Sequence, residues 1–172
     1  GAGLVSEATI RLADLGDDVD MAAITALTAA FKAEDDEVLS WSDGLGLATQ
    51  LRRRAAFVLL AVRDTEIVGM LMAQRTLSSF WGREACNIHD LYLVESARGE
   101  GLGRRLMDAC ADHARALGCG RLTLEVNADN EAARGLYRSL GFDIPEETGP
   151  SGSTFFVKCP LERYGQMKTK TT

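Results

Sequence analysis

The period of the apolar positions changes several times along the 172-residue chain, and each change predicts an element. Alternation of apolar and polar residues indicates a half-buried strand, whereas apolar residues three and four positions apart indicate one face of a helix. Short apolar runs bounded by turn residues indicate buried strands. The chain is therefore expected to form strands over 8–12, 56–62, 67–74, 85–94, 121–126, 142–144 and 154–161, and helices over about 19–31, 42–54, 102–117 and 131–140.

The ends of these elements carry residues that suit them. Asp129 can cap the last helix at its start, and Gly141 can end it. Because a helix separates the strand over 85–94 from the strand over 121–126, these two strands are expected to be parallel. Strands and helices alternate without repeats or a linker, which predicts one α/β domain over 4–164. Residues 165–172 are expected to form a flexible tail.

Composition narrows the function classes. The formal net charge of −6 argues against a nucleic-acid partner, which favours a basic face. No apolar run approaches the length that crosses a bilayer, so no membrane association is expected. The four cysteines form no C-x-x-C pair and the chain has two histidines, which disfavours a disulfide framework and a metal site. A reducing, cytoplasmic location is expected.

A glycine-rich segment, Arg98-Gly-Glu-Gly101-Leu-Gly103, separates a predicted strand from a predicted helix. Glycine allows positive φ and close approach of the backbone to a ligand, and a helix start presents unpaired N–H groups. Together these features predict an anion site, to which Arg98, Arg104 and Arg105 add positive charge. The spacing G-x-G-x-G differs from the dinucleotide-binding G-x-G-x-x-G, and no P-loop lysine follows. The alternative is a glycine turn without a ligand.

Two ordered motifs carry a resemblance to a known family. The glycine loop fits the pattern R/Q-x-x-G-x-G/A and follows the strand segment Asp90-Leu-Tyr-Leu93. A second pattern, N-x-x-A-x-x-x-Y-x-x-x-G-F, is matched by Asn130, Ala133, Tyr137, Gly141 and Phe142. With both motifs in this order, the chain resembles the GCN5-related N-acetyltransferase (GNAT) family over about 88–142.

This resemblance implies a fold and a cosubstrate. The GNAT fold is α/β, a mixed, strongly twisted sheet of six or seven strands with helices on both faces, and the cosubstrate is acetyl-CoA. By resemblance, the pantetheine arm pairs with the strand near Leu91 and the pyrophosphate lies on the N–H groups of 98–104. Asn130 would contact the arm, or would only satisfy its own helix start. The residues implied in cofactor binding are Leu91, Leu93, Arg98, Gly99, Glu100, Gly101, Leu102, Gly103, Arg104, Asn130 and Ala133.

Acetyl transfer to an amine requires that the amine lose a proton and that the leaving thiolate be stabilised. Tyr137 is the candidate proton donor, the alternative being a tyrosine packed by its ring. The segment from Phe80 to Tyr92 also resembles the diamine (spermidine/spermine) acetyltransferase branch, with His89 replacing the glutamate of that branch. Histidine accepts a proton near neutral pH, so His89 is a candidate base, or else a sheet residue satisfied by a neighbour. Asp90 and Trp81 are candidate substrate-binding residues, and Glu125 is interpreted as structural.

The sequence therefore predicts an acetyl-CoA-dependent N-acetyltransferase acting on a small primary amine, polyamine-like or amino-acid-like. Direct transfer in a ternary complex is expected, because none of the cysteines has a recognisable activating partner. One rival is acetylation of a protein N-terminus or lysine. Another is a non-catalytic acyl-CoA sensor, which would keep the glycine loop without needing Tyr137. A homodimer is possible, since dimers are common in the family.

Overall fold

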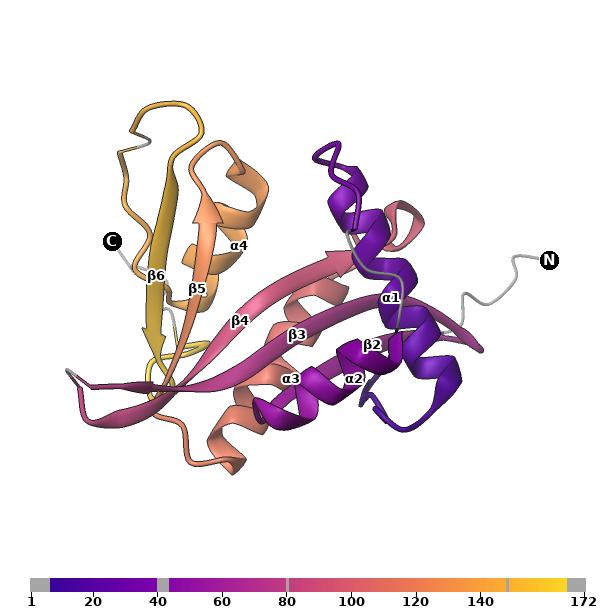
Figure 1. Ribbon diagram of the computed structural model, residues 1–172. Coiled ribbons are helices and arrows are strands. Elements are labelled where there is room, and N and C mark those ends of the chain that lie inside the picture. The colour runs from indigo at the N-terminus through magenta and orange to yellow at the C-terminus, as the bar shows by residue number, and fades with distance from the viewer. Residues whose placement is uncertain (1–6, 40–43, 80, 148, 167–172) are drawn as a thin grey trace. The chain divides into compact units, whose positions relative to one another are not determined.

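A computed structural model describes residues 7–39, 44–79, 81–147 and 149–166 of the chain. Its strands and helices follow the predicted order, and six strands form one sheet in the order β1-β2-β3-β4-β5-β6 (Figure 1). The elements are β1 (Thr9–Leu12), α1 (Asp18–Ala33), α2 (Gly44–Arg53), β2 (Ala56–Arg63), β3 (Glu66–Ser78), β4 (Arg83–Leu93), the 3-10 helix η1 (Glu95–Ala97), α3 (Leu102–Ala116), β5 (Arg121–Asn127), α4 (Glu131–Leu140) and β6 (Thr154–Pro160).

The sheet is mixed, as the resemblance to the GNAT family implies. β1 pairs with β2 and β2 with β3 in antiparallel register, while β4 and β5 are parallel. The parallel pair confirms the βαβ unit expected around α3. β6 runs antiparallel to β5 along its whole length. Within the described residues, no helix is long and apolar enough to cross a membrane.

The chain divides into two compact units, so that β3, β4 and α3 each contribute to both. The first unit contains Gly1–Gln74 and Asp90–Ala109, and the second contains Arg75–His89 and Cys110–Thr172. In the first unit α1 contacts α2, and α2 contacts β2. Apolar side chains from α1, α2, β2, β3 and β4 form the core of this unit: Met21, Ile24, Leu27, Ala48, Leu51, Val58, Leu60, Met70, Met72 and Tyr92.

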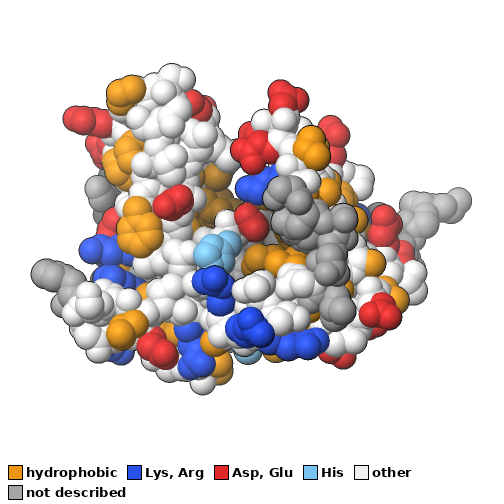
Figure 2. Space-filling model, viewed as in Figure 1, with side chains coloured by type: hydrophobic (Ala, Val, Ile, Leu, Met, Phe, Trp, Pro, Cys, Tyr) orange, Lys and Arg blue, Asp and Glu red, His pale blue; other side chains and the backbone are white. Residues whose placement is uncertain are grey.

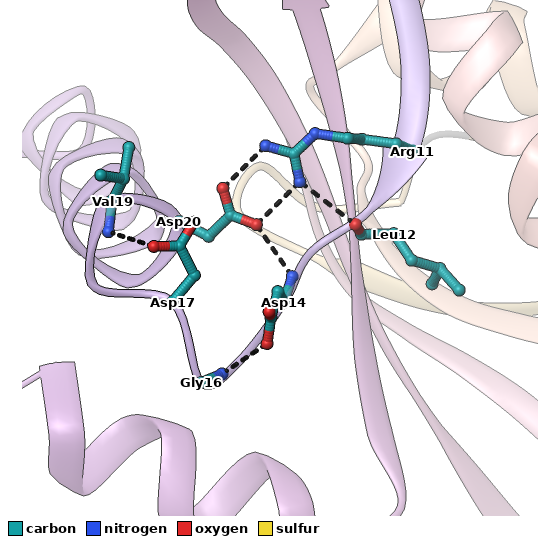
Figure 3. A network of polar contacts seen from close by, with 7 residues as sticks. All are labelled: Arg11, Leu12, Asp14, Gly16, Asp17, Val19 and Asp20. Carbon is teal, nitrogen blue, oxygen red and sulfur yellow. Dashed lines mark hydrogen bonds and ion pairs between the residues drawn. The ribbon is translucent and has the colours of Figure 1, made fainter.

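A buried carboxylate fastens α1 to β1 in the first unit (Figure 3). Asp20 has 1% of its side chain exposed and accepts two hydrogen bonds from the Arg11 guanidinium, each of 2.7 Å. It also accepts the backbone N–H of Asp14 at 2.8 Å. Asp17 caps α1 by accepting the Val19 N–H. The network satisfies a charge that would otherwise be costly to bury.

The second unit differs from the sequence prediction in two places. Residues 142–144 form no strand, because Asp143 makes a single backbone bond to Lys158 at 3.1 Å and Pro145 lacks a donor. The residue capping α4 is Asn130 rather than Asp129. Asp129 instead accepts the Gly152 N–H at 3.0 Å and so holds the turn before β6. The predicted start of the second helix, at Ser42 or Asp43, lies outside the described residues.

Candidate active site

The glycine loop lies in the first unit, between η1 and α3. Gly99 and Gly101 have φ values of 80° and 81°, which only glycine adopts readily. A Cβ at either position would meet nothing within 4 Å, so the backbone of the loop is open to a ligand. The first intrahelical bond of α3 runs from the Arg105 N–H to the Gly101 carbonyl, which leaves the preceding N–H groups of the helix start without intrahelical acceptors. This backbone suits the pyrophosphate of acetyl-CoA.

The arginines around the loop have partners of their own in the first unit. Arg98 donates to the Leu93 carbonyl at 3.0 Å and forms an ion pair with Glu34. This hydrogen-bonded contact with Glu34 raises the pKa of Arg98 further above its usual value. Arg105 donates to the Ala8 carbonyl at 2.7 Å. The backbone of the loop, more than these side chains, therefore faces an incoming anion.

Glu100 places a negative charge inside the same loop. Its carboxylate forms an ion pair with Arg63, at the end of β2. The Arg63 side chain is 21% exposed, so the pair is partly shielded from water. Arg63 therefore neutralises the Glu100 carboxylate and reduces its repulsion of an anion that approaches the loop. Neither sequence motif indicates this role of Arg63.

The end of β4 that precedes the loop also belongs to the first unit. Leu91, Leu93 and Asp90 are half-buried, and Tyr92 is buried against Phe31 with ring centroids 5.5 Å apart. Leu93 packs on Gly69, where a Cβ would come within 2.4 Å of the Leu93 side chain. Gly69 thus allows β3 and the end of β4 to approach closely. Tyr92 also lies under the Arg98 guanidinium, 5.5 Å from its ring centroid, which further restrains the start of the loop.

The candidate base lies in the second unit, where β4 and β5 run in parallel. Their paired register ends at Ile88 and Leu124. The next residues on the two strands, His89 and Glu125, line one cavity of about 230 Å³ together with Asn87 and Ile88. Asn87 donates to the Thr123 hydroxyl at 2.8 Å and so ties the two strands one register step earlier.

His89 and Glu125 are both exposed, so each can reach a ligand from solvent. Glu125 was interpreted as structural from its position in the sequence, and the structure puts it at the same cavity as His89. The parallel register of β4 and β5 could have suggested this neighbourhood. The cavity therefore joins two groups that can accept a proton or bind an ammonium group.

Tyr137 is 8% exposed on α4 in the second unit. Its ring lies 5.6 Å from the Phe142 ring, tilted by 57°. Burial raises the pKa of its hydroxyl to about 12. The hydroxyl therefore remains protonated at neutral pH, as a proton donor must, although the ring also packs as the alternative interpretation expected.

Asn130 and Ala133 form a capping hydrogen bond at the start of α4. The Asn130 carbonyl oxygen accepts the Ala133 N–H at 3.1 Å. The local alternative for Asn130, a residue that satisfies its own helix start, is thus present in the structure. The capping bond uses the side-chain oxygen of Asn130 and the backbone N–H of Ala133, which leaves the Asn130 amide group as the polar part available for a cofactor.

Trp81 lies at a different part of the second unit from His89. Its ring is 4.6 Å from the Arg121 guanidinium, at the start of β5. Glu125 is four residues further along the same strand, a separation of about 13 Å at the usual rise of a strand. Trp81 and His89 line different cavities. The structure therefore does not bring together the two residues that the diamine acetyltransferase resemblance had associated.

The cysteines are poor nucleophiles in this environment. Cys86, Cys110, Cys119 and Cys159 are all free and buried. A hydrogen bond with Cys86, followed by burial, raises the pKa of Cys110 well above its usual value, and burial raises that of Cys119 to about 11. Among the described residues, no group of three or more His, Cys, Asp or Glu side chains could hold a metal ion.

Comparison with known proteins identifies the family. A model of the acetyltransferase (GNAT) family matches residues 21–142. The chain is 33% identical over 103 residues to the uncharacterized N-acetyltransferase YhfO of Bacillus subtilis, covering 60% of this chain and 68% of that protein. It is 36% identical over 67 residues to an L-methionine sulfoximine/L-methionine sulfone acetyltransferase of Pseudomonas paraeruginosa, covering 39% of each chain.

A solved structure shows the same fold. The yncA protein of Salmonella typhimurium, a putative acetyltransferase determined with acetyl-CoA, has a TM-score of 0.71 and 23% identity, covering 91% of this chain and 95% of that one. The glycine loop, the α4 motif and the mixed six-stranded sheet agree with both kinds of comparison. The chain belongs to the GNAT family of acetyltransferases, with acetyl-CoA as its cosubstrate.

Proposed function

We propose that the chain transfers the acetyl group of acetyl-CoA to the primary amine of a small molecule, amino-acid-like or polyamine-like. The observation that carries this proposal is the cavity at the end of the β4–β5 register, which His89 and Glu125 both line. An ammonium group bound there would have a carboxylate to hold its charge and an imidazole to take its proton. A cavity of about 230 Å³ suits the amine end of a small acceptor.

The glycine loop would hold the cosubstrate through its backbone. The N–H groups at the start of α3 would bind the pyrophosphate, with Gly99 and Gly101 allowing close approach. Acetyl-CoA supplies an acetyl thioester, which is reactive toward a neutral amine. The residues of the chain then have two tasks, which are to remove a proton from the acceptor and to supply one to the departing sulfur.

His89 is the proposed base, with Glu125 orienting the ammonium group. Both side chains are exposed, so a proton taken from the amine can pass on to water. Tyr137 is the proposed acid, since it occupies the tyrosine position of the second motif and, with a pKa of about 12, is protonated at neutral pH. A tyrosine that had already ionised at neutral pH could not donate this proton.

Direct transfer to the amine is favoured over a route through an acetylated cysteine. The thiolate is the nucleophilic form of cysteine, and the raised pKa values of Cys110 and Cys119 disfavour it at neutral pH. Burial adds a steric barrier, because a buried sulfur is not accessible to a thioester. The reaction would therefore proceed in a ternary complex, with the amine attacking the acetyl group itself.

The similarity to an L-methionine sulfoximine/L-methionine sulfone acetyltransferase supports an amino-acid-like acceptor for this chain. A screen of thiol release from acetyl-CoA tests this choice against the others. The panel would contain amino acids including methionine sulfoximine, polyamines, an aminoglycoside and short peptides. Turnover confined to small amines is expected. Turnover with peptides alone would favour a protein acetyltransferase, and binding of acetyl-CoA without turnover of any amine would favour a sensor.

Substitutions of His89 and Glu125 test whether these residues have the proposed roles in acetyl transfer. His89→Gln is expected to lower kcat, because the acceptor amine then lacks the side chain proposed to take its proton. Glu125→Gln is expected to raise the KM of the amine with a smaller effect on kcat. Glu131→Gln, which removes one exposed carboxylate at the start of α4, is the matched control. Equal effects of Glu125→Gln and Glu131→Gln on KM would contradict the assignment of Glu125.

A further inference from the structure

Several cationic side chains of the second unit surround a cavity that the proposed chemistry does not use. This cavity has a volume of about 440 Å³ and is lined by Arg83, Arg121 and Lys158, among other residues. It lies at the starts of β4 and β5, whereas His89 and Glu125 lie beyond the other end of their paired register. In the space-filling view, Lys and Arg side chains gather near the lower part of β6 (Figure 2).

An aromatic ring holds two of these cations in place. The guanidinium groups of Arg83 and Arg121 lie over the Trp81 ring, 4.7 Å and 4.6 Å from its centroid. Trp81 and Arg83 in turn lie against Gly120, where a Cβ would come within 2.3 Å of the ring and 3.0 Å of the guanidinium. Stacked guanidinium groups are restrained, so they lose less conformational entropy when they bind an oxyanion through two parallel hydrogen bonds.

The cavity carries an excess of positive charge. Within the described parts of the chain, Arg83, Arg121 and Lys158 have no carboxylate within 4.0 Å. Of the acidic residues in the cavity wall, Asp143 is already paired with Arg163 at 2.9 Å, which leaves Glu162. The side chains that line the cavity therefore carry a net positive charge, which an added anion would neutralise.

Arg121 also has hydrogen-bonding capacity that the protein does not use. Its Nη2 donates to the Ser78 hydroxyl at 3.3 Å, whereas its Nε is buried without a partner among the described residues. Because the Nε has almost no accessible surface, a ligand in the cavity would contact Arg121 through the other nitrogen atoms of its guanidinium group.

We propose that this cavity binds a small molecule with phosphate or carboxylate groups through Arg83, Arg121 and Lys158. This site would bind its anion through side chains, whereas the glycine loop offers backbone N–H groups. The volume of the cavity is within the range that accommodates small-molecule ligands. Because the ligand would contact the starts of both β4 and β5, its binding should also stabilise the parallel pair that carries His89 and Glu125.

Fluorescence of Trp81 tests the proposal, in protein carrying Trp41→Phe so that one tryptophan reports. Saturating coenzyme A would first occupy the glycine loop, and inorganic phosphate or citrate would then be titrated separately. Saturable quenching with at least one probe is expected, together with a rise in Tm. The stronger probe distinguishes a phosphate ligand from a carboxylate ligand.

Three variants decide whether the response belongs to this cavity. Arg121→Gln is expected to weaken binding by about tenfold or more, the size of a lost hydrogen bond to a charged group. Lys158→Gln, on an exposed position of β6, should weaken it without affecting folding. Arg138→Gln removes the same charge from the exposed surface of α4 and should leave binding unchanged. No saturable response to either probe, or equal weakening by Lys158→Gln and Arg138→Gln, would overturn the proposal.

Discussion

Replacing Asp20 by asparagine should destabilise the protein without any change in its cofactor loop. The carboxylate of Asp20 is 1% exposed, and it accepts two bonds of 2.7 Å from Arg11 and one of 2.8 Å from the Asp14 N–H (Figure 3). Asparagine has nearly the same shape, but it carries no charge and offers one acceptor oxygen instead of two. The variant therefore leaves part of the Arg11 guanidinium without its partner.

The expected loss of stability depends on how deeply each partner of the Arg11–Asp20 ion pair is buried. A net contribution of about 1.5–3 kcal/mol is usual for a hydrogen bond to a charged group. Arg11 is 45% exposed and can turn toward water, so the second bond adds little once solvent screening is considered. We expect Asp20→Asn to cost about 2–3 kcal/mol, which for a chain of this size corresponds to a fall in Tm of roughly 4–12 °C.

The pH dependence of the stability difference provides a second, independent test of this prediction. The hydrogen bonds from Arg11, and then the backbone bond from Asp14, lower the pKa of Asp20. A carboxylate with a lowered pKa stabilises the fold above its unfolded value of about 3.9, and this stabilisation is lost as the pH falls through the folded pKa. The difference in unfolding free energy between wild type and Asp20→Asn should therefore be full at pH 7 and shrink below about pH 4.

Urea unfolding, followed by circular dichroism at pH 7 and at pH 3, measures both effects. Asp18→Asn removes the same charge two residues earlier, from an exposed position in the first turn of α1. That control should change stability by at most about 1 kcal/mol. Equal losses in the two variants, or a loss for Asp20→Asn that is as large at pH 3 as at pH 7, would refute the reasoning.

Three further predictions concern the site itself. Tyr137→Phe should lower turnover by about tenfold or more while the Kd for acetyl-CoA stays the same, and a parallel rise in Kd would point to a packing role instead. Gly101→Ala should weaken acetyl-CoA binding in calorimetry, because its φ of 81° costs an alanine about 1–2 kcal/mol. Gly135→Ala, inside α4 with open space around it, should instead raise Tm slightly and leave binding unchanged. Arg63→Gln should weaken acetyl-CoA binding by leaving the Glu100 charge uncompensated, and adding Glu100→Gln should restore the affinity, an outcome that a purely structural role of Arg63 would not produce.

The sequence by itself determined the elements and the cosubstrate. The helix over 131–140 was predicted with the bounds that the structure has, because a helical period and a terminal glycine both act within a few residues. The glycine loop is equally local, since positive φ at Gly99 and Gly101 is a property of single residues. Where local signals were weak, the prediction failed, as at 142–144, where neither a turn nor a partner strand follows directly.

The tertiary structure decided which side chains meet. His89 and Glu125 are 36 positions apart, and the register of two parallel strands brings them to one cavity. Trp81, eight residues before His89, lies in the turn that precedes β4 and contacts Arg121 at the start of β5 instead. Local periodicity specifies the elements of a chain, but contacts between elements depend on register and packing, which is why the residues around the acceptor site emerged only from the fold.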